Sequence, residues 1–70
     1  MKLSARNQIK GTVKKITEGA VNNEVVLEIA PGVELTSVIT KQSAQSLGLK
    51  EGSTAYAVVK ASNVMVGVDE

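Results

Sequence analysis

Apolar and polar residues alternate along most of the chain. Residues 21–30 follow a period of two, which predicts a half-buried strand, and residues 33–40 resume the same alternation. Between these runs, Pro31 fixes φ and Gly32 permits a positive φ, so the dipeptide favours a tight turn. We therefore predict that the two strands form a hairpin.

The opening stretch, residues 3–17, predicts one long strand with a polar face, because its apolar residues up to Val13 stand at odd positions. Gly11 lies in the middle of this stretch, and the apolar phase changes between Val13 and Ile16. Both features predict a bend or bulge in the strand. Residues 18–20 then make the turn into the next strand.

The alternation stops at residues 41–47, whose apolar residues stand three apart, as on one face of a helix. Thr40 is suited to the N-cap, because its hydroxyl can accept a hydrogen bond from a free backbone N–H. Gly48 is suited to the position after the helix end, with Leu49 as its hydrophobic contact. We predict about two turns of helix here.

After the helix, residues 54–60 and 64–68 predict a fourth and a fifth strand. Val, Ile and Thr make up 20 of the 70 residues, a composition that also favours strands. Three strands, a short helix and two more strands are the elements of an OB-type barrel. The predicted fold class is therefore all-β, a five-stranded OB-type barrel with one short helix between strands 3 and 4.

The length of the chain predicts a single domain over residues 1–70, since a second core would not fit. Seven of the apolar residues are Ala and eleven are Val, so the core must be built from small side chains. Domains of this size usually need disulfides, a metal or self-association for stability. Because the chain has no Cys and no His, we predict that it forms oligomers.

The same absences exclude thiol, iron–sulfur and ordinary zinc chemistry. Glu24 and Glu28 share a strand face but stand roughly 13 Å apart at about 3.3 Å per residue, too far for a glycosidase-type acid pair. A Ser–Lys pair could form from Ser62 and Lys60, although an exposed strand end explains both residues better. We predict that the protein is not an enzyme.

The sequence gives little evidence that the protein binds nucleic acid or membranes. The net charge is only +1, and Tyr56 is the sole aromatic residue on which a base could stack. Uncharged runs such as residues 61–68 are far shorter than the roughly 20 residues of a membrane span, and the N-terminus lacks an apolar signal core. We expect a cytoplasmic protein that binds neither.

Groups able to bind an anion gather in four segments. A tetrahedral oxyanion offers only acceptors, so its site needs hydroxyls, N–H groups and fixed cations, without acidic groups. Each segment also has a purely structural interpretation, as a cap, a solvated strand face or a surface charge. The segments are Ser4 with Arg6, Thr40 with Ser43, Lys60 with Ser62, and the turn at Gly19.

Three segments have a distinctive sequence: Ser4-Ala5-Arg6-Asn7-Gln8-Ile9-Lys10-Gly11-Thr12-Val13, Glu18-Gly19-Ala20-Val21 and Lys60-Ala61-Ser62-Asn63-Val64-Met65. Together they resemble the molbindins, the small Mop proteins that bind molybdate, over essentially the whole chain. The chain is also similar to the transport-associated OB domains (TOBE type) of molybdate-import ATPases and to the molybdate-sensing domain of a transcription regulator. The resemblance implies an OB-type fold and a hexamer, a trimer of dimers, with oxyanions held between subunits.

The resemblance also implies which residues hold the oxyanion. One subunit would supply Ser4, Ala5 and Arg6, and its partner would supply Thr40, Ser43, Lys60, Ala61 and Ser62, with the two alanines contributing main chain only. A second class of site near the threefold axis would be lined by the turn Gly19, Ala20, Val21 and Asn22. No residue is implied as a direct metal ligand, and no cofactor is implied.

By this resemblance, the expected function is binding of molybdate, or of tungstate, for storage and homeostasis of molybdenum. Molybdate and tungstate have the same charge and shape, so the sequence does not separate them. Two alternatives stay open: an OB-fold protein that binds single-stranded RNA, similar in size to bacterial translation initiation factor one, and a purely structural oligomer.

Overall fold

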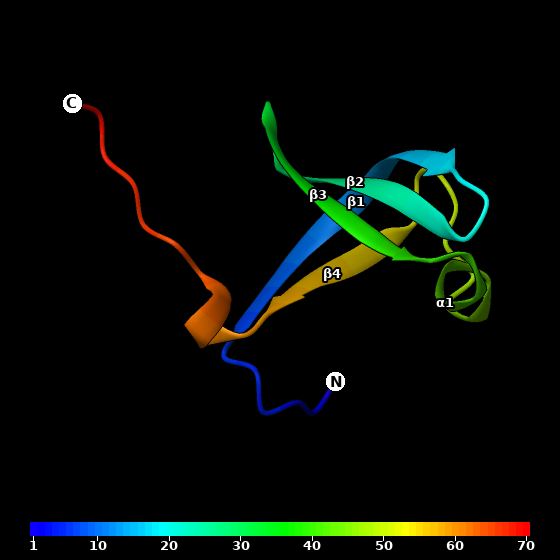
Figure 1. The fold of residues 1–70 in the computed structure, drawn as a ribbon, viewed down its shortest axis with the longest axis horizontal. Coiled ribbons are helices and arrows are strands. Elements are labelled where there is room, and N and C mark those ends of the chain that lie inside the picture. Colours follow the sequence, from blue (N-terminus) through cyan, green and yellow to red (C-terminus); the bar gives the residue numbers. More distant parts are fainter.

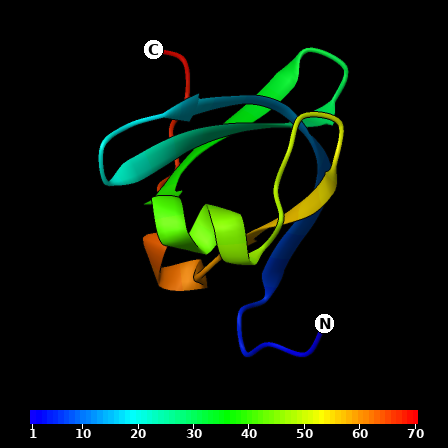
Figure 2. The same ribbon diagram turned by 90° about the vertical axis from the view of Figure 1, so that its right-hand side faces the viewer.

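The computed structural model describes residues 1–70 and shows a four-stranded antiparallel sheet with one short α-helix (Figure 1). The strands lie in the order β3-β2-β1-β4. In chain order the elements are β1 (Asn7–Glu18), β2 (Asn22–Ala30), β3 (Val33–Thr40), α1 (Lys41–Ser46), β4 (Thr54–Val59) and the 3-10 helix η1 (Ala61–Asn63). The sheet curls into part of a barrel, with α1 near one end (Figure 2). Neither helix has the length and hydropathy needed to cross a bilayer.

The predicted hairpin of β2 and β3 is confirmed. The two strands pair antiparallel from Asn22↔Thr40 to Ala30↔Val33. Gly32 in the turn between them has a φ of 75°, a conformation that side chains with a Cβ rarely adopt. The turn chemistry in the sequence therefore fixes this part of the fold.

The predicted irregularity in β1 is present, but Gly11 is not its centre. The register of β1 against β2 shifts between Val13 and Lys15, which explains why the apolar phase changes after Val13. Gly11 serves a different purpose. A Cβ there would lie 2.9 Å from the backbone oxygen of Glu28 and 3.1 Å from Cγ2 of Ile29, so glycine allows β2 to approach closely.

The helix begins and ends as the sequence predicts. The Oγ1 atom of Thr40 accepts a hydrogen bond from the backbone N–H of Ser43 at 3.0 Å and so caps the start of α1. At the other end, Gly48 has a φ of 63°, and the backbone N–H of Leu49 donates to the carbonyl oxygen of Ala44 at 3.2 Å. The side chain of Leu49 packs against the core, which completes this helix end.

The first strand is shorter at its start than predicted. It begins at Asn7 rather than Leu3, because Asn7 pairs with Val59, the last residue of β4, and earlier residues have no strand to pair with. Ser4, Ala5 and Arg6 therefore lie in the segment before β1 and not on a strand face.

The predicted fifth strand at residues 64–68 is absent, so the five-stranded barrel does not close within one chain. After η1 the chain runs away from the sheet as an extended tail (Figure 1). A strand needs a neighbouring edge for its backbone hydrogen bonds, and the tail meets none within its own chain. Its apolar side chains stay exposed, with Met65 94%, Val66 91% and Val68 89% accessible.

The core is as thin as the composition predicts. Only five of the 70 side chains are buried: Val13, Asn23, Val25, Leu27 and Ala44. The three aliphatic residues on β1 and β2 form one cluster against which Ile16, Ile39, Leu49, Ala55 and Ala57 pack partly buried. So little buried apolar surface leaves the lone chain with little hydrophobic stabilisation.

Candidate functional site

Six of the predicted site residues come together at one end of the sheet. Asn7 at the start of β1 pairs with Val59 at the end of β4. The segments that flank this pair therefore leave the sheet at the same end, with the 4–6 segment and η1 near one another (Figure 1). We call this group the sheet-end cluster; its members are Ser4, Ala5, Arg6, Lys60, Ala61 and Ser62.

The sheet-end cluster is rich in hydrogen-bond donors that have no acceptor within the chain. No ion pair or side-chain hydrogen bond engages Arg6 or Lys60, and the hydroxyls of Ser4 and Ser62 are also free. Of the backbone hydrogen bonds around η1, those of Asn63 and Val64 use the carbonyls of Lys60 and Ala61, and none uses the N–H of Ala61 or Ser62. These donors can therefore serve a ligand that offers acceptors only.

The charge around the sheet-end cluster is positive. Residues 1–17 and 52–68 contain no Asp or Glu, whereas Arg6 and Lys60 stand in the cluster and Lys2 and Lys10 stand close by in sequence. All of its side chains except the half-buried Ala5 are exposed. A dianion approaching this end of the sheet therefore meets cations and no carboxylate from the neighbouring sequence.

One contact in this cluster was not anticipated from the sequence. The Nε2 atom of Gln8 donates to the carbonyl oxygen of Ala5 at 3.0 Å. The carbonyl oxygen of Ala5, an acceptor within the 4–6 segment, therefore already has a hydrogen-bond donor in its own chain. The only signal for this contact in the sequence is the side-chain amide of Gln8, which stands three residues after Ala5.

Thr40 and Ser43 lie at the opposite end of the sheet. Thr40 ends β3 and caps α1, and its hydroxyl also donates to Oγ of Ser43 at 2.7 Å. The Thr40 hydroxyl is thus fully used within the helix cap, whereas the hydroxyl proton of Ser43 stays available. The structural interpretation of Thr40 as a cap is confirmed.

The turn between β1 and β2 lies beside this helix start. The backbone N–H of Lys41 donates to the carbonyl oxygen of Val21 at 2.8 Å, and Asn22 pairs with Thr40. A Cβ at Gly19 would lie 2.5 Å from the carbonyl oxygen of Asn22, so only glycine fits there. The residues predicted for the second site, Gly19, Ala20, Val21 and Asn22, thus form one tight exposed turn.

Within one chain, Thr40 and Ser43 do not reach the sheet-end cluster. The twelve residues of β1 separate the two ends, on the order of 40 Å of chain at about 3.3 Å per residue. None of the four cavities of the chain is lined by a residue of the sheet-end cluster, by Thr40 or by Ser43. A single chain therefore presents these donors on open surface, and only another chain could enclose them.

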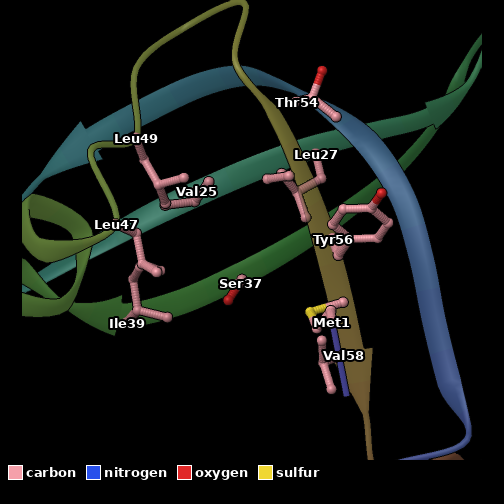
Figure 3. Close-up of a pocket in the computed structure, with 11 residues that line it drawn as sticks. Met1, Val25, Leu27, Ser37, Ile39, Leu47, Leu49, Thr54, Tyr56 and Val58 are labelled. Carbon is pink, nitrogen blue, oxygen red and sulfur yellow. The ribbon is translucent and has the colours of Figure 1, made fainter. Parts of the chain in front are cut away.

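The largest cavity lies inside the curled sheet and is apolar. Its volume is about 360 Å³, and nine of its eleven lining residues are hydrophobic. Figure 3 shows Val25 and Leu27 of β2, Leu47 and Leu49 after α1, and Tyr56 of β4 around it. Such a lining does not suit a small hydrated anion, so this cavity is not the oxyanion site.

The other chemistry considered from the sequence has no geometry to support it. No group of three or more His, Cys, Asp or Glu side chains could hold a metal ion. Glu28 lies 3.8 Å from the ammonium of Lys14, which also donates to Glu34. The hydrogen bond and charge of Glu34 raise the pKa of Lys14 above its ordinary value. Glu28 therefore belongs to an exposed ion-pair cluster and not to a pair of catalytic acids.

Comparison with known proteins agrees with this geometry. The TOBE domain family matches residues 3–66. "Molybdenum-pterin-binding protein 2" of Clostridium pasteurianum is 52% identical over 66 residues, which cover 94% of this chain and 97% of that protein. The solved structure of MopII from the same organism superposes with a TM-score of 0.89 at 49% identity, covering 96% of this chain and all of the other.

A second solved structure is that of the cytoplasmic molybdate-binding protein ModG with molybdate bound. It superposes with a TM-score of 0.92 at 55% identity and covers 99% of this chain but 49% of ModG. The curled antiparallel sheet with one short helix is thus the fold that this chain shares with small molybdate-binding and molybdenum-pterin-binding proteins. The chain belongs to the TOBE domain family, among the small molybdenum-pterin-binding (Mop) proteins.

Proposed function

We propose that this protein binds molybdate as an intact dianion and stores it for the cell. The observation that carries the proposal is the sheet-end cluster, where two cations and several unpaired N–H and O–H donors gather without a carboxylate. Relatives at about half identity are named for molybdenum-pterin binding, and ModG is described with molybdate bound.

The mechanism is passive binding, without a covalent step. Arg6 and Lys60 provide charge-assisted hydrogen bonds, and Ser4, Ser62 and the backbone N–H groups of Ala5, Ala61 and Ser62 provide neutral ones. The chain has no His, the side chain whose ordinary pKa lies near neutrality, so binding is expected to follow the concentration of the ligand. Tungstate, with the same charge and shape, is expected to bind in the same way.

The site is proposed to be shared between subunits of a hexamer built as a trimer of dimers. Two features support a shared site: the donors lie on open surface within one chain, and Thr40 and Ser43 stand at the far end of the sheet. The Ser43 hydroxyl would then contribute from a neighbouring subunit, and the turn 19–22 would line a second class of site near the threefold axis. The thin core supplies a second reason for assembly, since ligand and subunit contacts replace stability that a single chain lacks.

Isothermal titration calorimetry of the purified protein with sodium molybdate tests this proposal, with sodium sulfate as the control anion. Saturable binding of molybdate and none of sulfate at equal concentration is expected. Lys60→Ala should weaken molybdate binding by at least about 1.5 kcal/mol, about tenfold in Kd, because a charge-assisted hydrogen bond is lost. Lys50→Ala, an exposed lysine outside the cluster, should bind like the wild type.

Two results would contradict the proposal. If neither anion binds, and a single-stranded RNA binds in a salt-sensitive way, the RNA-binding alternative is correct. If molybdate binds equally well to the wild type and to Lys60→Ala, Lys60 is not part of the site.

A further inference from the structure

A polar cavity lies between the end of the β1–β2 hairpin and the end of α1. Its volume is about 330 Å³, and none of its lining residues belongs to the sheet-end cluster. Only three of the eight are hydrophobic, in contrast to the apolar cavity inside the curled sheet. The polar lining comes from Glu18 of β1, Asn23 of β2, and Gln45, Gly48 and Lys50 in and after α1. The cavity therefore suits a polar occupant.

Asn23 is the only polar side chain in the buried interior, with 3% of its surface exposed. It shares a face of β2 with Val25 and Leu27, where the alternation favours another aliphatic residue. Its Oδ1 atom has no hydrogen-bond partner. Buried polar atoms in folded proteins nearly always have partners, and a polar residue that breaks a core pattern indicates a specific contact. The unpartnered oxygen therefore indicates that a ligand binds here.

Glu18 stands directly opposite Asn23. The two residues pair in the register of β1 against β2, and both line the cavity. The backbone N–H of Gly19 donates to the carbonyl oxygen of Asn22 at 2.9 Å, so the next pair, Glu18 with Asn23, has no hydrogen bonds between its backbones. Opposed side chains lie closest in pairs of this kind. No ion pair or hydrogen bond engages the Glu18 carboxylate, which therefore stands free beside the unpartnered amide.

The end of α1 adds two further oxygen atoms. The side-chain amide of Gln45 makes no hydrogen bond within the chain. The carbonyl oxygen of Gly48 accepts none of the backbone hydrogen bonds around the helix end. The terminal torsion of an Asn or Gln side chain is broad, so each amide can turn its oxygen toward the cavity that it lines. One carboxylate and three neutral oxygens thus gather from two parts of the chain.

Oxygen ligands without nitrogen or sulfur suit hard cations. The charge of the cavity favours one positive charge over two. Calcium sites bind more tightly as their charged ligands increase in number, whereas this cavity has one carboxylate and, at Lys50, a competing ammonium. Neutral carbonyl oxygens are sufficient to hold K⁺ in channel filters.

We infer that this cavity binds a monovalent alkali cation, K⁺ or Na⁺, through the oxygens of Glu18, Asn23, Gln45 and Gly48. The ion ties the end of the β1–β2 hairpin to the end of α1, two segments that meet here without a side-chain hydrogen bond between them. Binding of the ion is independent of the proposed oxyanion site.

Sodium NMR detects the ion directly, because the signal of ²³Na broadens when the ion binds a protein. Wild-type protein in NaCl should broaden the signal, and added KCl should reverse the broadening by competition. N-methylglucamine chloride at the same ionic strength should leave it broad, because this bulky organic cation cannot be surrounded by the four oxygens.

Matched variants locate the site. Asn23→Leu keeps a similar size and should weaken cation binding at least about tenfold, because a contact to a charge is lost. In N-methylglucamine chloride the same variant should unfold at a higher urea concentration than the wild type, since a buried oxygen without a partner is gone. Glu18→Gln should also bind at least about tenfold more weakly. Glu24→Gln makes the same change at an exposed carboxylate on the other face of the sheet and should bind like the wild type.

Lys50→Ala separates an external ion from an internal one. If the cavity binds a metal cation, removing the competing ammonium should strengthen the binding severalfold. If neither K⁺ nor Na⁺ binds the wild type and Lys50→Ala loses stability, the Lys50 ammonium itself fills the cavity and the inference is wrong.

Two other results would overturn the inference. Equal broadening of the sodium signal by the wild type and by Asn23→Leu would place the ion elsewhere. Displacement of Na⁺ by Ca²⁺ at concentrations far below those needed for K⁺ would refute the argument from charge. No molybdate is present in these measurements, so failure of the proposed function would leave their outcome unchanged.

Discussion

Replacing Gly11 by alanine tests the close approach of β1 and β2. A Cβ at this position would lie 2.9 Å from the backbone oxygen of Glu28 and 3.1 Å from Cγ2 of Ile29, both closer than ordinary van der Waals contact. The oxygen belongs to a strand that pairs on both sides, so it cannot move without distorting two ladders. The methyl group must therefore push the two backbones apart.

The cost follows from two opposing effects. Overpacking of this kind costs about 1–3 kcal/mol, and removing glycine from a strand returns roughly 0.5–1 kcal/mol of chain entropy. A net loss of about 1–2 kcal/mol is expected, or roughly 5–15 °C in Tm for a domain of this size. Since domains typically have about 0.05–0.15 kcal/mol of stability per residue, this loss is a large share of the total.

Urea denaturation followed by circular dichroism measures the loss, at one fixed protein concentration because the proposed assembly would add to the stability. Thr12→Ala, an exposed neighbour, serves as the control and should change the free energy of unfolding by no more than about 0.5 kcal/mol. If Gly11→Ala unfolds within about 0.5 kcal/mol of the wild type, the argument from close approach is refuted.

Three further predictions concern the ligand, the helix cap and the ion pairs. Saturating molybdate should raise Tm in a thermal melt, because a ligand that binds the folded state and not the unfolded chain stabilises the folded state, and an unmoved melting curve would count against binding. Thr40→Ala should cost about 1 kcal/mol in urea denaturation because the cap of α1 is lost; a free energy of unfolding equal to that of the wild type would contradict the cap. Glu34→Gln should lower the pKa of Lys14 measured by NMR, since the charge and hydrogen bond of Glu34 raise it. Because the pKa of Lys14 is raised in the folded state, this pairing stabilises the fold below about pH 10.5, and the stabilisation is lost as the pH rises above that value. If the pKa of Lys14 is the same in Glu34→Gln as in the wild type, the pairing is disproved.

Local signals in the sequence predicted the local parts of the fold. The caps of α1, the turn at Gly32 and the phase change after Val13 are each decided by residues that are neighbours in the chain. The sequence offers two positions for the β1 bulge, Gly11 and the phase change after Val13. Glycine in a strand can mark either a bulge or a close backbone approach, and only the register of β1 against β2 distinguishes the two.

Pairing between distant segments decided the parts that the sequence did not predict. Ser4 and Arg6 continue the alternation of β1, but the strand begins only where β4 offers a partner at Val59. Residues 64–68 alternate as a strand should, yet their own sheet offers no edge within reach. The resemblance alone groups the site residues, whereas the sheet topology places the sheet-end cluster at one end of the sheet and Thr40 and Ser43 at the other.

The five buried side chains also determine how the protein responds to temperature. The heat capacity change of unfolding grows with the apolar surface that unfolding exposes, and typical domains of this length reach about 0.8–1.0 kcal/mol/K. A lone chain with so small an interior falls below this range, so its stability curve is broad and low. Each contact that buries the exposed valines and Met65 against another copy narrows and raises the curve. If the chain forms the proposed hexamer, its working temperature range is therefore a property of the assembly, set by how many chains are present to share their surfaces.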